Sequence, residues 1–410
     1  MEKKISLGSL FLITFIDLVG IGIIIPIIPL IFFETPILAD SVPYAARTVI
    51  LGLLLSIFPL MQFFGAPLLG AFADKHGRKP VLTLSILGIC ISYILFAVGL
   101  WMNMLWLLFF SRALAGFCGG NLSVVKSVIA DISDEKSKVK NFGMMGMAFG
   151  LGFIFGPFLG GVLSNSELVS WFTMSTPFWA AALFSFINVL YVHFNLVETL
   201  EKPTETKINA FTGLRNVKKA FTLPRLRLFF ASYFLFMFGF TFFTQFFSVY
   251  AYERFGYGTT EIGLIFAYAG VWIAIAQGFV ARKLSKYFAP ETLLKYSTFF
   301  LGVTLLSLLF PAKGVYLYAI MPFMALCNGV NLPNFSALFS NSASKQAQGE
   351  ILGIEQSVVS LAWIFPPIIS GIVAAAHPSL PILLGAGFVF LGWGVFLFAS
   401  KEKQKEFTAQ

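Results

Sequence analysis

Ionisable side chains are rare inside the long apolar stretches of this chain, and one of the deepest is Asp17. It lies ten residues past Leu7 in "LGSLFLITFIDLVGIGIIIP", which in a helix places it about 15 Å deep, near the middle of a bilayer. An apolar medium disfavours a charged carboxylate, so an acid at this depth can exchange a proton. We predict that Asp17 carries a proton. The alternative is a polar residue that only holds its helix to its neighbours.

Two further ionisable residues could take part in the same chemistry. Arg112 follows Leu105 by seven residues, so it lies about 10 Å deep and within side-chain reach of the level of Asp17. A guanidinium beside the acid would favour the ionised acid and release its proton when the pair breaks; a permanent structural pair is the alternative. Glu355 lies five residues into the apolar stretch 350–375. It is a second candidate proton carrier, but its shallow depth favours a hydrated acid at the membrane interface.

A third group of charges lies in "GAFADKHGRKP" at 70–80. A loop that attracts anionic lipid would account for its lysines, but not for Asp74 or for the two glycines. We predict that Gly70 lets its helix approach a helix of the other half of the chain. We predict that Gly77 supplies a backbone conformation that is costly for other residues.

The elements that carry these residues follow from composition. The 410 residues are 58% hydrophobic and 11% charged, and 50 of them are Phe, so the chain is predicted to be an all-α integral membrane protein. Apolar stretches of about 20 residues, each long enough to cross a bilayer as a helix, recur along the chain. We predict twelve transmembrane helices at 6–33, 48–72, 80–100, 105–130, 142–164, 171–194, 226–250, 261–281, 291–310, 314–339, 350–375 and 380–400.

The basic residues predict the orientation of these helices. Most of the 28 Lys and Arg fall in the loops and ends on the side of the two termini, which predicts that both termini are cytosolic. Attraction to anionic membrane lipids then explains the net charge of +9, so no nucleic-acid partner is predicted. The basic start and the apolar stretch that follows it are predicted to be a retained first span, because the stretch is too long for a signal peptide.

Several classes of function are not supported by the sequence. The three cysteines lie inside apolar stretches, and the three histidines are too dispersed for metal-ligand spacing, so neither disulfides nor a metal site is predicted. A phosphate-binding P-loop is missing. We therefore expect no enzyme activity, no cofactor and no use of ATP, and we predict a monomer.

The chain divides into two similar halves. The longest hydrophilic stretch separates six predicted spans at 1–199 from six at 228–410, with a cytosolic linker at 200–227. At an offset of 208, "GAFADKHGRK" lies over "GFVARKLSKY", and two more pairs of segments match in the same order at an offset of 210. Two six-helix bundles related by pseudo-symmetry are typical of alternating-access carriers, whose substrate site lies at the midplane between the halves.

Five motifs in order resemble those of the major facilitator superfamily, and within it the twelve-span drug:proton antiporters, similar to the tetracycline/proton antiporters. The motif at 70–80 departs from the family pattern G-x-L-A-D-R-x-G-R-K in having Phe72 for the Leu and Lys75 for the first Arg. The motif at 150–161 resembles the antiporter motif G-x-x-x-G-P-x-x-G-G. The motifs are "GAFADKHGRKP" (70–80), "SRALAGFCGGN" (111–121, containing Arg112), "GLGFIFGPFLGG" (150–161), "DLVGIGIIIPIIP" (17–29) and "FNLVETL" (194–200).

The resemblance implies roles for particular residues. It implies that Asp74 and Arg78 form a charge relay with Asp131 that stabilises the outward-open state, and the acidic motif adds Glu198 to this cytosolic gate. The antiporter motif implies a close, sliding seal against the other half on the outer side; generic helix packing is the alternative. The residues of this motif are Gly152, Gly156, Pro157, Gly160 and Gly161.

The substrate is predicted from polar groups in aromatic surroundings. Amides inside apolar helices either bond across helices or face a wet cavity, and phenylalanines suit an organic compound. The candidates are Asn121, Gln245, Phe246, Asn328 and Asn331. Tetracycline exporters of the similar group carry acids inside the third and ninth helices, whereas 81–100 and 292–310 contain none.

We therefore predict a secondary active transporter of a bacterial inner membrane that exports a lipophilic drug or small metabolite in exchange for protons. A dedicated exporter or importer of one natural product or nutrient, such as a siderophore, is the first alternative. A membrane receptor or scaffold is the second, although most loops are too short to form a partner domain.

Overall fold

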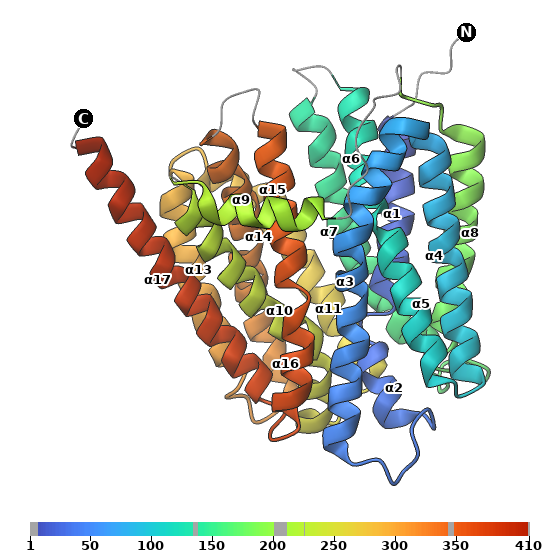
Figure 1. The fold of residues 1–410 in the computed structure, drawn as a ribbon. Coiled ribbons are helices and arrows are strands. Elements are labelled where there is room, and N and C mark those ends of the chain that lie inside the picture. Colours follow the sequence, from blue (N-terminus) through green and yellow to red (C-terminus); the bar gives the residue numbers. More distant parts are fainter. Residues whose placement is uncertain (1–6, 134–137, 201–210, 225, 343–347, 409–410) are drawn as a thin grey trace. The chain divides into compact units, whose positions relative to one another are not determined.

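The computed structural model describes residues 7–133, 138–200, 211–224, 226–342 and 348–408 (Figure 1). Every regular element in these ranges is helical, as expected for a chain whose backbone must satisfy its own hydrogen bonds in lipid. The first half of the chain contains α1 (Leu7–Ile23), α2 (Ile28–Glu34), α3 (Tyr44–His76), α4 (Arg78–Trp101), α5 (Leu105–Cys118), η1 (Gly119–Asn121), α6 (Leu122–Asp131), α7 (Lys138–Leu163) and α8 (Thr176–Asn195).

The second half begins with a short helix that the sequence analysis did not predict, α9, inside the linker. Its elements are α9 (Thr212–Thr222), α10 (Arg227–Phe255), α11 (Thr259–Ile275), the π-helical η2 (Ala276–Val280), α12 (Ala281–Leu284), α13 (Pro290–Ser307), η3 (Gly314–Tyr316), α14 (Leu317–Asn341), α15 (Gln348–Ala362), α16 (Phe365–Ala374) and α17 (Leu380–Thr408).

Each of the twelve predicted spans contains a helix. Within the described residues, ten helical segments are long and apolar enough to cross a membrane. The other two predicted spans correspond to α7, whose described apolar part is the shorter Met147–Leu163, and to α13, which opens with the polar sequence "PETLLKYST". Four spans are interrupted: the first near Pro26 and Pro29, the fourth at η1, the eighth at η2, and the eleventh before Pro366. Proline removes a backbone donor, which explains two of these breaks.

The chain forms two compact units. Unit 1 contains 1–43, 57–211 and 257–267, and unit 2 contains 44–56, 212–256 and 268–410. Each unit is thus built mainly from one predicted half of the chain and takes one helix end from the other half.

In unit 1, α1 packs against α7 and α8, and α4 packs against α5 and α8. The core between these helices includes Ile13, Leu82, Ile86, Val124 and Val192, all 0–1% exposed. The charged loop after α3 therefore lies at the end of a rigid, well-packed bundle.

In unit 2, α10 packs against α17, α15 and α16, and α13 packs against α14 and α17. Aromatic rings fill much of this core. The rings of Phe230 and Phe339 are stacked with centres 4.2 Å apart, and Tyr233 contacts Phe335 at 4.7 Å. Stacked and edge-on rings at such distances add to the stabilisation from apolar burial.

Candidate functional site

Asp17 is buried in α1 with half of its carboxylate unsatisfied. The side chain is 4% exposed. Asn121 of η1 donates a hydrogen bond from Nδ2 to Asp17 Oδ2 over 3.3 Å, whereas Asp17 Oδ1 and Asn121 Oδ1 have no partner. The fold thus joins a predicted proton carrier to a predicted substrate ligand 104 residues away. A buried polar atom without a partner costs free energy, so this pair is suited to receive a proton or a ligand.

Arg112 of α5 does not form the predicted ion pair with Asp17. Within the described residues, the ion pairs of the structure involve other groups. The Arg112 guanidinium carbon instead lies 4.6 Å from the centre of the Phe58 ring of α3, and Nε has no hydrogen-bond partner. The attraction of a cation to a ring face explains this placement.

Tyr93 of α4 lies near both of these charged residues. Its side chain is 3% exposed. A Cβ built on Gly20, one turn after Asp17, would lie 3.4 Å from the Tyr93 hydroxyl. The sequence analysis missed Tyr93, although a tyrosine in the apolar stretch 80–100 was visible as a polar group at this depth.

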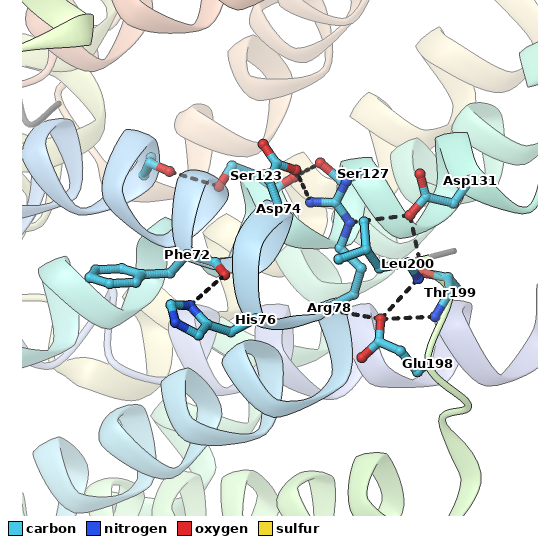
Figure 2. A network of polar contacts seen from close by, with 11 residues as sticks. Phe72, Asp74, His76, Arg78, Ser123, Ser127, Asp131, Glu198, Thr199 and Leu200 are labelled. Atoms are coloured by element: carbon cyan, nitrogen blue, oxygen red, sulfur yellow. Dashed lines mark hydrogen bonds and ion pairs between the residues drawn. The ribbon is translucent and has the colours of Figure 1, made fainter. Parts of the chain in front are cut away.

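The charged loop between α3 and α4 forms a network with three other segments of unit 1 (Figure 2). Arg78 is 7% exposed. It donates from Nη1 to Asp74, one turn earlier on α3, and from Nε to Asp131 Oδ2 at the end of α6 over 3.1 Å. Thr199 also donates to Asp131 Oδ2, over 3.1 Å. The contacts among Asp74, Arg78 and Asp131 that the family resemblance implies are therefore present.

Glu198 holds the beginning of α4 through the backbone. Its carboxylate accepts backbone N–H groups of Arg78 at 2.8 Å and Lys79 at 3.1 Å, as well as those of Thr199 and Leu200 at 3.0 and 2.9 Å. Partial burial raises the pKa of Glu198, but these four hydrogen bonds outweigh it and leave the pKa below its usual value. Glu198 thus acts as an external cap for a helix start whose N–H groups have no partner within the helix.

Gly77 is required in this loop for two reasons. Its backbone has φ 103° and ψ 150°, a region that is essentially restricted to glycine. A Cβ at this position would also lie 2.5 Å from Glu198 Oε2. The predicted special conformation of Gly77 is confirmed.

The predicted role of Gly70 at the other half of the chain stays a prediction, and the structure describes its surroundings within unit 1. Gly70 lies opposite Ser123 of α6, within its own half of the chain, and a Cβ would stand at an ordinary 3.7 Å from Ser123 Oγ. Among the described residues of unit 1, no close helix approach depends on Gly70. The hydroxyl of Ser123 is turned instead toward the Ala66 carbonyl of α3.

The predicted seal of α7 against the other half of the chain is wrong for three of its glycines. A Cβ on Gly152 would lie 2.7 Å from Leu18 Cβ, one on Gly156 2.5 Å from Gly22 Cα, and one on Gly160 too close to the Ile23 carbonyl. All three partners belong to α1. The stripe faces α1 because backbones can approach closely only where neither helix carries a side chain.

Gly161 and Pro157 do contact a segment from the other half of the chain, the beginning of α11, within unit 1. A Cβ on Gly161 would lie 2.8 Å from the Thr259 carbonyl oxygen, and one on Gly263 would lie 2.5 Å from the Pro157 carbonyl oxygen. Ser164 also donates to Thr259 Oγ1 over 2.6 Å. The residues of the antiporter motif therefore contact two different neighbours, α1 and the beginning of α11.

A similar close contact in unit 2 was missed by the sequence analysis. A Cβ on Gly52 of α3 would meet the Pro367 carbonyl of α16, and one on Gly371 would meet the Thr48 carbonyl of α3. The glycines of "ILGLLL" and "ISGIVA" were the residues in the sequence that indicated this close contact. Each was hidden in an apolar stretch that gave no spacing to follow.

The remaining substrate candidates lie in unit 2, on α10 and α14. Asn331 accepts hydrogen bonds at Oδ1 from Ser297 (2.5 Å) and Thr298 (3.0 Å) of α13, so it joins α13 to α14 as interhelical contact. Asn328 is 4% exposed, with its Oδ1 unpaired. Phe246 is buried, at 1% exposed, and its predicted role in lining the substrate site stays a prediction. Gln245 of α10 is partly exposed.

Glu355 of α15 is not the hydrated interfacial acid that was expected. It is 8% exposed, and its Oε1 accepts a hydrogen bond from Ser336 of α14 over 2.6 Å. The Tyr233 hydroxyl of α10 also hydrogen-bonds to it. Depth along a helix does not fix exposure, because two neighbouring helices cover this face of α15. No group of three potential metal ligands occurs in the described residues.

An apolar helical bundle with charges buried in its spans is the architecture of a membrane transporter. Comparison with known proteins makes this specific: the model of the Major Facilitator Superfamily matches residues 10–367. The chain belongs to the Major Facilitator Superfamily, and it is an integral membrane transporter and not an enzyme.

The relatives of this chain include bacterial drug-resistance proteins. It is 30% identical to the class C tetracycline resistance protein of Escherichia coli, over 89% of this chain and 88% of that protein. It is 28% identical to the quinolone resistance protein NorA of Staphylococcus aureus, over 99% and 98% of the two chains.

Solved structures agree on the fold. The human organic anion transporter MFSD10 superposes with a TM-score of 0.73 at 22% identity, covering 95% of this chain and 98% of that one. The nucleoside transporter NupG gives 0.75 at 16% identity, covering 96% and 99%. At these identities the likeness shows the fold alone.

Proposed function

We propose that this protein is a proton-coupled antiporter that exports a lipophilic organic compound across a bacterial inner membrane, with both termini in the cytosol. The observation that carries the proposal is Asp17, an acid buried in a span with one carboxylate oxygen unpaired. The names of the relatives support export, because they are resistance proteins for tetracyclines and quinolones. Protons entering the cell would supply the driving force.

In this proposal Asp17 takes up the coupled proton, and the strength of its hydrogen bond with Asn121 depends on whether Asp17 is charged. The Asn121 amide donates to Asp17 Oδ2, a hydrogen bond that stabilises the carboxylate. Protonation of Asp17 weakens this bond and frees the Asn121 side chain for the substrate. Arg112, with its Nε unpaired, supplies positive charge that favours proton release in the opposite step. Membrane lipids surround the protein, which acts as a monomer.

The loop network of Asp74, Arg78, Asp131 and Glu198 is proposed to hold the cytosolic ends of the first-half helices together in one state of the transport cycle. Its support is that Arg78 ties α3 to α6 and Glu198 ties the segment after α8 to α4. Four spans are thus joined at one end by charge. The network favours the outward-open state, whose cytosolic side is closed.

The substrate is proposed to be apolar or aromatic and not a metal-chelated tetracycline. The stretches 81–100 and 292–310 contain no acidic residue, so those spans offer no carboxylate for a divalent metal. A dedicated natural product remains the alternative substrate. A panel of lipophilic dyes separates the two, since efflux of many dyes from inverted vesicles supports a drug exporter and efflux of none supports a dedicated carrier.

The central test is Asp17→Asn in proteoliposomes. With an imposed pH gradient, the unchanged protein should move a transported dye uphill, and Asp17→Asn should abolish uphill transport. The variant should retain exchange of labelled for unlabelled dye without a gradient, because Asn preserves the volume and polarity of the site. Asp40→Asn, at an exposed position between α2 and α3, is the matched control and should behave as the unchanged protein. Uphill transport by Asp17→Asn would exclude Asp17 as the proton carrier.

A further inference from the structure

The helix α9 lies inside the stretch that was expected to be only a linker. Figure 1 shows it crossing the direction of α10 and α15 and not running along them. It packs against both helices within unit 2. Asn216 of α9 donates from Nδ2 to Ser357 Oγ of α15 over 3.2 Å. An amphipathic helix that runs across transmembrane helices is suited to lie in the plane of the membrane surface.

The side chains of α9 divide into three faces, because successive residues are about 100° apart around a helix. Gly213 and Ala220 are buried and face the protein. Leu214 and Phe221 lie about 100° further around and remain 46% and 39% exposed. Arg215 and Lys218 follow beyond them and are exposed.

The apolar face points along the spans, in the direction of the bilayer. The ring of Phe221 lies edge-on to the ring of Phe234, with centres 6.3 Å apart. Phe234 lies seven residues into α10 from Arg227, about 10 Å along the span. Phe221 therefore extends toward the depth at which acyl chains begin, and α9 lies at the level of the lipid headgroups.

We propose that α9 is a binding surface for anionic phospholipid. Leu214 and Phe221 enter the outer acyl region, and Arg215 and Lys218 contact headgroup phosphates beside them. The sequence "TGLRNVKKAFT" contains three basic residues and no acidic one, so its charge is complementary to an anionic leaflet. A guanidinium can hold a phosphate through two parallel hydrogen bonds. With the proposed orientation, this leaflet is the cytosolic one.

This surface is connected to a buried acid in unit 2. The Asn216–Ser357 hydrogen bond joins α9 to α15 two residues after Glu355. Lipid bound to α9 therefore restrains the part of α15 that carries Glu355. The binding of lipid is independent of substrate and proton transport, so its test does not depend on the proposed function.

The first experiment measures hydrogen–deuterium exchange of the α9 amides in the full-length protein. Nanodiscs of phosphatidylcholine are compared with nanodiscs that also contain phosphatidylglycerol. The anionic lipid should slow the exchange of α9 by about fivefold for each basic side chain that reaches a headgroup. The double variant Arg215→Gln/Lys218→Gln should lose this difference. The matched control Arg282→Gln/Lys283→Gln, also exposed and at the end of a helix, should keep it. Equal exchange of the unchanged protein in both lipids would overturn the proposal.

The second experiment tests the orientation of α9 with spin labels at Leu214→Cys and Lys219→Cys, in a background without the three native cysteines. Position 214 should collide with oxygen, which concentrates in lipid, more than with an aqueous nickel chelate. Position 219, about 140° away around the helix, should show the opposite preference. If position 214 is reached mainly by the nickel chelate, α9 faces water or another protein and the proposal fails.

Discussion

The two loops at 70–80 and 278–287, which match in sequence at an offset of 208, have different structures. In the first, Gly77 has φ 103° and α4 begins at the next residue. In the second, Ser285 stands at the matching position with φ −64°, and α13 begins only at Pro290. The Ser285 hydroxyl bonds back to the Ala281 carbonyl of its own helix. One residue without a side chain thus decides whether the chain turns sharply.

The charges of the two loops differ in the same way. Arg78 is 7% exposed and bonds two carboxylates, whereas Arg282 and Lys283 are exposed. Arg282 occupies the position of Asp74 in the alignment of the halves, so the second loop carries no acid there. Helices thus flank both loops, while the charge network of the first requires a glycine turn and an acid supplied by another segment.

The largest effect is expected for Gly77→Ala. The substitution forces a side chain into a backbone region that costs about 1–3 kcal/mol and places Cβ 2.5 Å from Glu198 Oε2. The free energy of unfolding should fall by at least that amount, which thermal unfolding of the purified protein would detect. Gly278→Ala is the matched control in the second loop, because no atom lies within 4 Å of its Cβ. Equal losses in both variants would contradict the comparison.

A smaller effect is expected for Asp74→Asn. This change removes the charge that Arg78 pairs with on α3 and leaves the shape of the side chain unchanged. Because Asp74 is partly exposed, the pair contributes no more than about 1 kcal/mol. Transport should slow by about two- to fivefold, while expression should be normal. Initial rates of dye efflux per molecule of protein in proteoliposomes would measure this. Unchanged rates would mean that the loop serves only to set orientation.

The pH dependence of the first loop should come from Glu198. Its folded-state pKa lies below the usual value, so its stabilisation is fully present above the usual value and is lost as the pH falls through the lower one. The protection of the Arg78 and Lys79 amides from hydrogen exchange, relative to their intrinsic rates at each pH, should fall as the pH drops below the usual pKa of Glu. Glu198→Gln should remove this pH dependence and raise exchange at neutral pH, because Gln lacks the charge that accepts four N–H groups. A pH dependence that survives in the variant would assign it to another acid.

The smallest effect is expected in the second loop. Arg282→Gln removes an exposed charge, and such substitutions change stability by less than about 0.5 kcal/mol. Both the melting temperature and the rate of dye efflux should match those of the unchanged protein. A transport defect as large as that of Asp74→Asn would show that the two loops act as equivalent gates.

Much of the fold could be predicted from sequence because hydropathy is a local property. The twelve predicted spans each contain a helix. Gly77 and Arg78 were identified from a motif, and the family resemblance implied the contact between Arg78 and Asp131 that the structure contains. The direction of the α7 glycines was not predictable, since any small stripe can fit several neighbours, and only packing selected α1. The helix α9 was hidden because a short amphipathic segment has no long apolar stretch.

The sequence by itself determined the membrane class, the number of spans and the family, since these depend on residue composition and on motifs read in order. The tertiary structure decided which polar groups meet. It placed Asn121 on Asp17, turned Arg112 toward Phe58 and buried Glu355 beneath Ser336 and Tyr233. The physical reason is that burial and hydrogen bonding depend on neighbouring helices, which are distant along the chain and leave no local pattern.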